Sequence, residues 1–110
     1  MASAAYDTIR AATLAKQQVV ANYRGYPREM SPHVLGTKDG REHGLFYQFA
    51  GRSSSGLGQP GSTANWRCIF IDELMDVTIR DGEFYTATEI GPRPGSQTCV
   101  EQVDVVAPQA

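Results

Sequence analysis

Residues 44–71 constrain the fold of this chain more than any other stretch. They contain two short segments rich in apolar and aromatic residues, 44–50 and 66–71, each bounded by residues that favour turns. This pattern predicts two buried β-strands. The polar loop between them, residues 51–65, is too long for a hairpin turn, and loops of this length inside a compact domain are usually either functional or disordered. The loop and its flanking strands are therefore the first place to look for a binding site.

The composition of the chain predicts a single soluble globular domain. It has 110 residues, of which 41% are hydrophobic and 20% are charged. The formal net charge of −2 gives no overall field that would attract nucleic acid or acidic lipid, although a local basic patch is compatible with it. The longest apolar run is much shorter than the ~20 residues that span a membrane, and the N-terminus lacks the pattern of a secretory signal. We therefore expect a cytoplasmic protein without membrane association.

The two cysteines, Cys68 and Cys99, lack the spacing of metal ligands. A disulfide between them would need an oxidising compartment, which nothing else in the sequence implies. We interpret both as free thiols and expect Cys68 to be buried within a strand. Neither a metal site nor a cofactor is predicted.

The order of secondary structure predicts one helix followed by short strands. Residues 4–16 are alanine-rich without Gly or Pro, which favours a helix, and Ser3 can cap it. Strands are expected at 18–24, 28–35, 44–50, 66–71, 76–80 and, at the end of the chain, 99–106. Residues 83–86 either pair with the strand at 76–80 or trail off. These elements predict a mainly β fold, a strongly bent sheet or partly closed barrel of five to six strands, with the helix over one opening.

Turn-forming residues and prolines indicate where the strands begin and end within the domain. Asp39 and Gly40 form the strongest hairpin signal in the chain. Pro32 lacks an N–H group, which predicts that its strand lies at a sheet edge or contains a bulge. We expect one domain over 1–110, comprising the helix at 4–16, the barrel at 18–86, a linker at 87–98, and an extra strand and tail at 99–110.

Several short motifs, in order, resemble a known family. They are the tripeptide 23–25, the segment 28–36, the Tyr47-Gln48 pair, the glycine- and serine-containing segment 51–56, and the strand and bend at 66–74. Over residues 8–80 the chain is similar to the WYL domain family, and most closely to its short stand-alone members. It departs from that pattern in two ways. His43-Gly44-Leu45 stands near the place of the Trp-Tyr-Leu tripeptide, and no helix-turn-helix domain precedes the predicted barrel.

The resemblance implies a small Sm-like or SH3-like β-barrel. It also implies a polar and basic surface that binds a ligand, either a nucleotide or nucleic acid. It does not imply that the chain reads DNA, because the DNA-reading domain of the family's transcription regulators has no counterpart in the sequence.

The candidate ligand-binding residues come from neighbouring strands and from the loop. They are Arg28, His33, Tyr47, Gln48, Arg52, Ser53, Ser55, Trp66 and Arg67. Arginine offers a planar fork of donors for carboxylate or phosphate, serine and glutamine add neutral hydrogen bonds, and the aromatic rings can stack on a planar ligand. Gly51 and Gly56 would let backbone N–H groups approach an anion.

Each of these residues also has a purely structural interpretation. The arginines can be solvated strand positions beside a flexible loop, Trp66 can anchor the core, and Gln48 can be a hydrogen-bonded clamp. A nucleophilic role for Cys68 with His33 would need an activated thiol, which nothing in the sequence indicates. No phosphate loop, nucleophile elbow or metalloprotease motif is present, so we expect a protein that is not an enzyme.

Three classes of function remain open from the sequence. The first is a module that binds an anionic or nucleotide-like small molecule, for which Arg28, Arg52 and Arg67 should converge on one site. The second is a protein–protein interaction or assembly module, including a homo-oligomer formed through strand edges. The third is a single-stranded nucleic-acid binder, against which the acidic totals argue.

Overall fold

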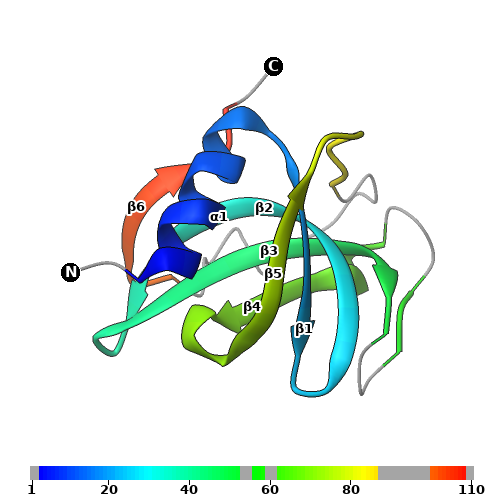
Figure 1. Cartoon of the computed structure of the whole chain (residues 1–110), viewed down its shortest axis with the longest axis horizontal. Coiled ribbons are helices and arrows are strands. Elements are labelled where there is room, and N and C mark those ends of the chain that lie inside the picture. The colour runs from blue at the N-terminus through cyan, green and yellow to red at the C-terminus, as the bar shows by residue number, and fades with distance from the viewer. Residues whose placement is uncertain (1–2, 53–55, 59–61, 87–99, 109–110) are drawn as a thin grey trace.

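One N-terminal helix packs against a strongly bent antiparallel sheet (Figure 1). The computed structural model describes residues 3–52, 56–58, 62–86 and 100–108. The elements are α1 (Ala4–Ala15), β1 (Gln18–Tyr23), β2 (Tyr26–Lys38), β3 (Arg41–Gly51), η1 (Thr63–Asn65), β4 (Trp66–Phe70), η2 (Ile71–Glu73), β5 (Leu74–Arg80) and β6 (Gln102–Val106), where η1 and η2 are 3-10 helices. The predicted mainly β class with one N-terminal helix is confirmed.

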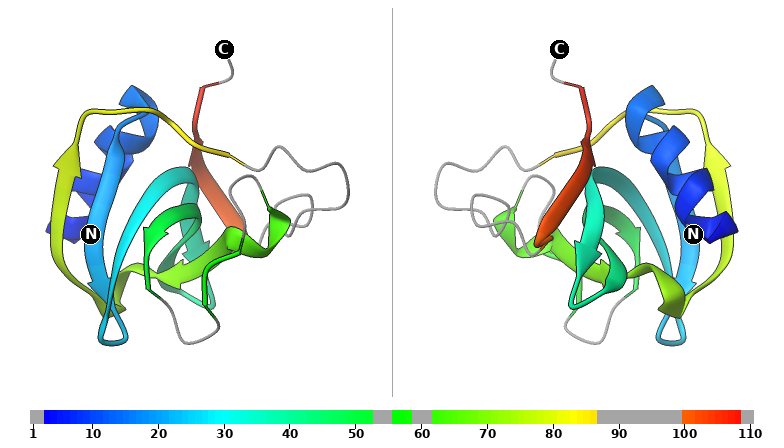
Figure 2. Two further views of the ribbon diagram at one scale, coloured as in Figure 1. Left: turned by 90° about the vertical axis from the view of Figure 1, so that its right-hand side faces the viewer. Right: turned by 90° about the vertical axis from the view of Figure 1, so that its left-hand side faces the viewer.

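The sheet is organised around β2. Its strand order is β4-β3-β2-β1-β5, and β6 also pairs with β2. β3 pairs with β2 along almost its whole length, whereas β1 pairs with the first part of β2 and β6 with its last part. The long strands curve so that the sheet curls around its core without closing (Figure 2). This is the partly closed barrel that the sequence predicts.

Helix α1 covers one opening of the curled sheet. The Ser3 hydroxyl accepts a hydrogen bond from the Tyr6 backbone N–H, which caps the first turn as predicted. Lys16 ends the helix in the left-handed conformation, where its N–H bonds the carbonyls of Ala12 and Thr13. The buried side of the helix presents Tyr6, Ile9 and Ala12 to the sheet. None of the helices in the described part of the chain is long and apolar enough to cross a membrane.

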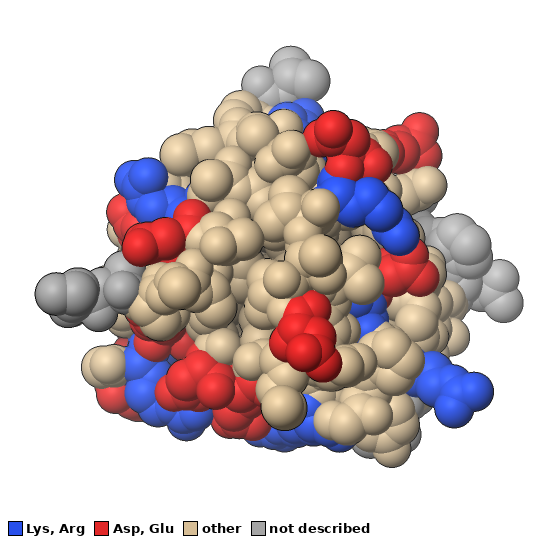
Figure 3. Space-filling view, viewed as in Figure 1, with Lys and Arg blue, Asp and Glu red and all other residues tan. Residues whose placement is uncertain are grey.

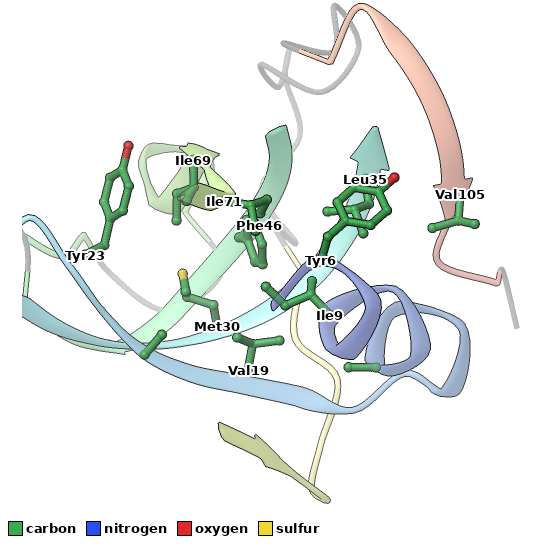
Figure 4. Packing of buried hydrophobic residues seen from close by; sticks show 12 residues of the cluster. Tyr6, Ile9, Val19, Tyr23, Met30, Leu35, Phe46, Ile69, Ile71 and Val105 are labelled. Carbon is green, nitrogen blue, oxygen red and sulfur yellow. The ribbon is translucent and has the colours of Figure 1, made fainter. Parts of the chain in front are cut away.

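The main hydrophobic core fills the inner face of the sheet below α1 (Figure 4). Ile9, Val19, Met30, Phe46 and Ile69 have no exposed surface. Figure 4 also shows that the core is elongated, with Tyr23 at one end, Val105 at the other, and Tyr6 and Ile9 between them. A second, smaller cluster lies on the opposite face of β3 and β4 and consists of Leu45, Tyr47 and Trp66 with Val34 against it.

The turn signals in the sequence are largely confirmed. Asp39 and Gly40 both have positive φ, as a tight hairpin between β2 and β3 requires. The pairing of β2 with β3 shifts between Pro32 and Val34, so the predicted bulge is present. Among the described strands, Pro32 pairs with β3 alone, because β1 pairs with β2 only as far as Met30 and β6 only from Val34, so β2 is also locally an edge there.

The last part of the chain returns to the sheet. Residues 83–86 form no strand, so they trail off after β5, and the Tyr85 backbone N–H donates to the Ser31 hydroxyl on β2. The predicted last strand is confirmed as β6. The expected linker at 87–98 lies outside the described residues.

Cys68 lies within β4, as the sequence predicts, but it is neither buried nor a free thiol. Its side chain is exposed, because strand alternation in β4 turns Arg67 and Ile69 toward the inner face and Cys68 away from it. Cys68 is also disulfide-bonded rather than a free thiol. Cys99, the other cysteine of the chain, lies outside the described residues.

Candidate functional site

Three polar side chains lie on the core face of the sheet, at the end away from α1. The register between strands places them there: Gln48 is opposite Met30, and Arg67 is opposite Phe46. Arg28 precedes Met30 by two residues and so projects from the same face. Met30 and Phe46 belong to the main core, which means that Arg28, Gln48 and Arg67 close that core at its second end. We call these three residues the inner cluster.

Gln48 is the centre of the inner cluster. Its side-chain oxygen accepts from Arg28 Nη1 at 3.4 Å and from Arg67 Nε at 3.2 Å. Its side-chain nitrogen donates to the backbone carbonyls of Ala50 at 3.1 Å and Arg52 at 3.0 Å. The amide has no exposed surface and makes the two acceptor and two donor bonds of which it is capable.

Arg67 connects the inner cluster to the two ends of the loop. Its Nη2 donates to the Gly56 carbonyl at 3.0 Å, and its Nη1 donates to the Ala64 carbonyl at 2.6 Å and the Trp66 carbonyl at 3.1 Å. All three of its nitrogens therefore have neutral oxygen acceptors. Together with Gln48, this guanidinium shapes the start and the end of the segment between β3 and β4.

Arg28 differs from Arg67 because most of its donors have no partner. Its side chain is 5% exposed, and its guanidinium lies over the rings of Tyr23, at 4.9 Å, and Tyr26, at 6.0 Å. The only hydrogen bond that it makes to the described residues is the long one from Nη1 to Gln48. Arg28 Nε is buried and has no acceptor.

The charge of Arg28 also lacks compensation by a carboxylate. The ion pairs among the described residues use other arginines, namely Arg10, Arg24, Arg41 and Arg80. Burial lowers the pKa of the Arg28 guanidinium, and the positive charge of Arg67 lowers it further. Desolvation likewise lowers the pKa of Arg67. Two guanidinium groups thus share one neutral amide at the end of an apolar core, an arrangement that is costly without an anion.

Three of the predicted site residues lie on the other face of the sheet. Tyr47 and Trp66 pack edge to face at 5.1 Å, and His33 packs against Trp66 at 4.9 Å. The Tyr47 hydroxyl donates to the Ser62 carbonyl, and His33 Nε2 lies 2.9 Å from the Tyr85 carbonyl. The structure therefore separates these aromatic residues from the arginines that they were expected to accompany.

The predicted contribution of the loop is also different. Arg52 has an exposed side chain and takes part through its backbone, whose carbonyl accepts from Gln48 and whose N–H donates to Pro27. Gly51 has φ +93°, and a Cβ there would lie 2.3 Å from the Pro27 carbonyl oxygen, so the chain turns only with glycine. Gly56 presents its carbonyl, not its N–H, to Arg67. Ser53 and Ser55 lie outside the described residues.

Sequence reasoning missed Tyr23 and Tyr26 as members of the site. They are directly opposite each other at the end of the β1–β2 hairpin, and Arg28 follows Tyr26 by two residues. Two residues apart on a strand means the same face, so this spacing was the available signal. The hairpin thus places two aromatic rings against the guanidinium of Arg28, whose Nε has no acceptor.

Neither a metal site among the described residues nor a related protein indicates what the inner cluster binds. In the described segments, no three His, Cys, Asp or Glu residues lie close enough to hold a metal ion. Comparisons with protein-family models, with curated proteins and with solved structures found no match to this chain. The resemblance to the WYL domain family stays a prediction. The ligand of the inner cluster has to be inferred from the residues that form it.

Proposed function

We propose that this protein is a non-enzymatic ligand-binding module that takes the anionic group of a small molecule at the inner cluster. The observation that carries the proposal is the state of Arg28, a buried guanidinium with a buried Nε that lacks an acceptor and no ion pair to the described residues. Cations buried in this way are normally paired. An anion supplied from outside would provide the missing pairing.

Gln48 and Arg67 support this proposal by holding the site in place. Gln48 bonds Arg28 Nη1 and the backbone carbonyls of Ala50 and Arg52 at the end of β3, while Arg67 bonds the segment that leads into β4. Preorganised donors bind an anion with less ordering cost than mobile surface arginines do. The nucleotide-like ligand and the regulatory role suggested by the resemblance belong to this proposal and rest on the same cluster.

The proposal is tested by thermal unfolding at constant ionic strength with inorganic phosphate, a nucleoside monophosphate or a carboxylate added in turn. A ligand that binds only the native state raises the unfolding midpoint with concentration. Arg28→Met should remove this response, while Arg80→Met, which alters an arginine that pairs with Glu29, should keep it. A rise of the same size in both variants, or no rise with any anion, would contradict the proposal.

Strand-edge assembly is a second candidate function. β5 and β6 each pair with a single neighbour, and Met75, Val103 and Val106 on these strands have exposed fractions of 66%, 49% and 50%. Unpaired edges with exposed apolar side chains favour pairing with another chain. A concentration-dependent rise in molar mass by light scattering would support a homo-oligomer, and a constant monomer mass would exclude it.

Nucleic-acid binding is less favoured by the distribution of charge. Figure 3 shows basic and acidic side chains intermixed on the face that it presents, without a broad patch of one sign. Arg28 and Arg67 lie on the core face of the sheet, which a nucleic-acid backbone could not reach. A single-strand binder would need a continuous basic groove with exposed aromatic rings.

The cellular location also remains a proposal. The sequence predicts a cytoplasmic protein with free thiols, whereas disulfides persist mainly in oxidising compartments. The disulfide at Cys68 therefore favours an oxidising compartment over the cytoplasm. Alkylation of the protein as isolated from its own cells, followed by mass spectrometry, distinguishes the two, because a free thiol is labelled without prior reduction.

A further inference from the structure

We infer that the group recognised at Arg28 is a single carboxylate, bound side-on by Nε and Nη2, rather than a phosphate; this inference rests on the proposed function. The described structure leaves one specific edge of the guanidinium without acceptors. Nη1 points to the Gln48 oxygen, whereas neither Nε nor Nη2 donates to any described residue. The Nε–H and one Nη2–H of an arginine point in the same direction, which is the geometry of a bidentate pair with two oxygens of one group.

The donors available elsewhere in the cluster limit the size and charge of the ligand. The Gln48 amide nitrogen already donates to two carbonyls, and the described bonds of Arg67 occupy all three of its nitrogens. Arg28 therefore offers the two parallel donors that a carboxylate needs. A phosphate monoester carries three acceptor oxygens and close to two negative charges at neutral pH, and it would leave acceptors unsatisfied beside an apolar core.

The surroundings of Arg28 favour a ligand with an apolar body behind its carboxylate. The guanidinium lies over the Tyr23 and Tyr26 rings, and Met30 from the same face of β2 is fully buried. Arg28 forms no ion pair with a described carboxylate, so one negative charge would balance this guanidinium. An aromatic or aliphatic monocarboxylate fits these conditions.

The experiment follows the arginine Nε–H signals of the full chain by proton–nitrogen NMR during titration. The probes are benzoate, acetate, inorganic phosphate and adenosine monophosphate, each added at the same ionic strength. The Arg28 signal is assigned by its loss in Arg28→Lys, and Arg80→Lys is the matched control. We expect benzoate to move the Arg28 Nε–H signal to saturation. We expect Arg28→Lys, which keeps the charge but loses the fork, to weaken benzoate binding roughly tenfold or more.

Each other result has a defined meaning. Saturable binding of phosphate or the nucleotide without binding of benzoate or acetate would overturn the carboxylate assignment and leave the proposed anion site intact. Benzoate binding that does not move the Arg28 Nε–H signal would also overturn the assignment. Failure of all four probes to bind would overturn both proposals. Which of the four probes binds is read from the unaltered protein, so the decision between carboxylate and phosphate holds even if Arg28→Lys does not fold.

Discussion

The two ends of the curled sheet are closed in different ways. At one end α1 places Ile9 and Ala12, both without exposed surface, against the core. At the other end the core stops at Arg28, Gln48 and Arg67. Gln48 and Arg67 also bond the backbone carbonyls of Arg52, Gly56 and Ala64, which lie between β3 and β4.

This difference suggests that the helix end mainly stabilises the fold, whereas the inner cluster mainly binds a ligand. Burial of apolar surface stabilises a fold in proportion to the area removed from water. Buried hydrogen bonds and charges contribute little net stability, because desolvation offsets most of what they gain. We therefore expect the helix end to hold the fold together, and the inner cluster to offer directed donors at a small or negative contribution to stability.

The largest effect is expected at the helix end. Ile9→Ala should lower the free energy of unfolding by about 3 kcal/mol, because it leaves a cavity between α1 and the sheet. The measurement is equilibrium unfolding in urea, with the anion titration repeated on the folded variant. Anion affinity should not change. A loss below about 1 kcal/mol would mean that α1 is not part of the cooperative core.

Removal of the amide at the opposite end should have a smaller effect on stability. Gln48→Leu leaves the Ala50 and Arg52 carbonyls and both guanidinium groups without their shared partner, and should cost about 2 kcal/mol. Backbone hydrogen exchange at Arg52, whose N–H bonds the Pro27 carbonyl, should become faster. Gln102→Leu is an exposed control, and an equal loss of stability in both variants would contradict a clamp role for Gln48.

The buried side chain of His43 should make the stability of the protein depend on pH, because it can take up a proton, whereas the buried Arg28 keeps its charge. His43 is 3% exposed, packs against Phe70 at 4.3 Å, and has two buried ring nitrogens without a hydrogen-bond partner. Desolvation lowers the pKa of His43, and Lys38 and Arg41 lower it further. Because the unfolded chain binds this proton more readily, stability should be fully present above the unfolded pKa of about 6.5 and should fall as the pH drops below it.

The slope of stability with pH tests this expectation. The stability that depends on a neutral His43 should be lost as the pH falls from the unfolded pKa toward the lower folded pKa. His43→Leu should remove that part of the slope, as measured by urea unfolding at several pH values. An unchanged slope in the variant would show that other groups account for the acid sensitivity.

The smallest effect on stability is expected from a change at Arg28, and it should be an increase rather than a loss. Without an added anion, Arg28→Met should leave stability unchanged or raise it by about 1 kcal/mol, because it replaces an uncompensated buried charge with an apolar side chain of similar length. The same variant should lose the midpoint shift with anions. A loss of stability as large as that of Ile9→Ala would mean that Arg28 is a structural residue rather than a binding residue.

Local signals in the sequence predicted most elements of the fold. The alanine-rich segment with Ser3 before it predicts α1, Asp39 with Gly40 predicts the β2–β3 hairpin, and the apolar segments predict β3 and β4. These features depend on neighbours within a few residues, so they can be recognised without knowledge of the fold. The residue types of the inner cluster were also identified from the sequence as candidates.

The tertiary structure alone decided which candidates meet. The pairing of β2 with β3 shifts at Phe49 and again at His33, and each extra residue changes which side chains share a face. The register between the strands places Gln48 with Arg28 and Arg67 on the inner face and leaves Tyr47 and Trp66 on the outer one. Strand alternation likewise turned Cys68 outward.

The sequence by itself therefore determined the helix, the strands and the supply of arginine donors. It could not determine that Arg28 would be buried over Tyr23 without an ion pair to a described carboxylate. That property depends on strand register and on the position of every acidic residue in space, and both are set only when the sheet curls around its core.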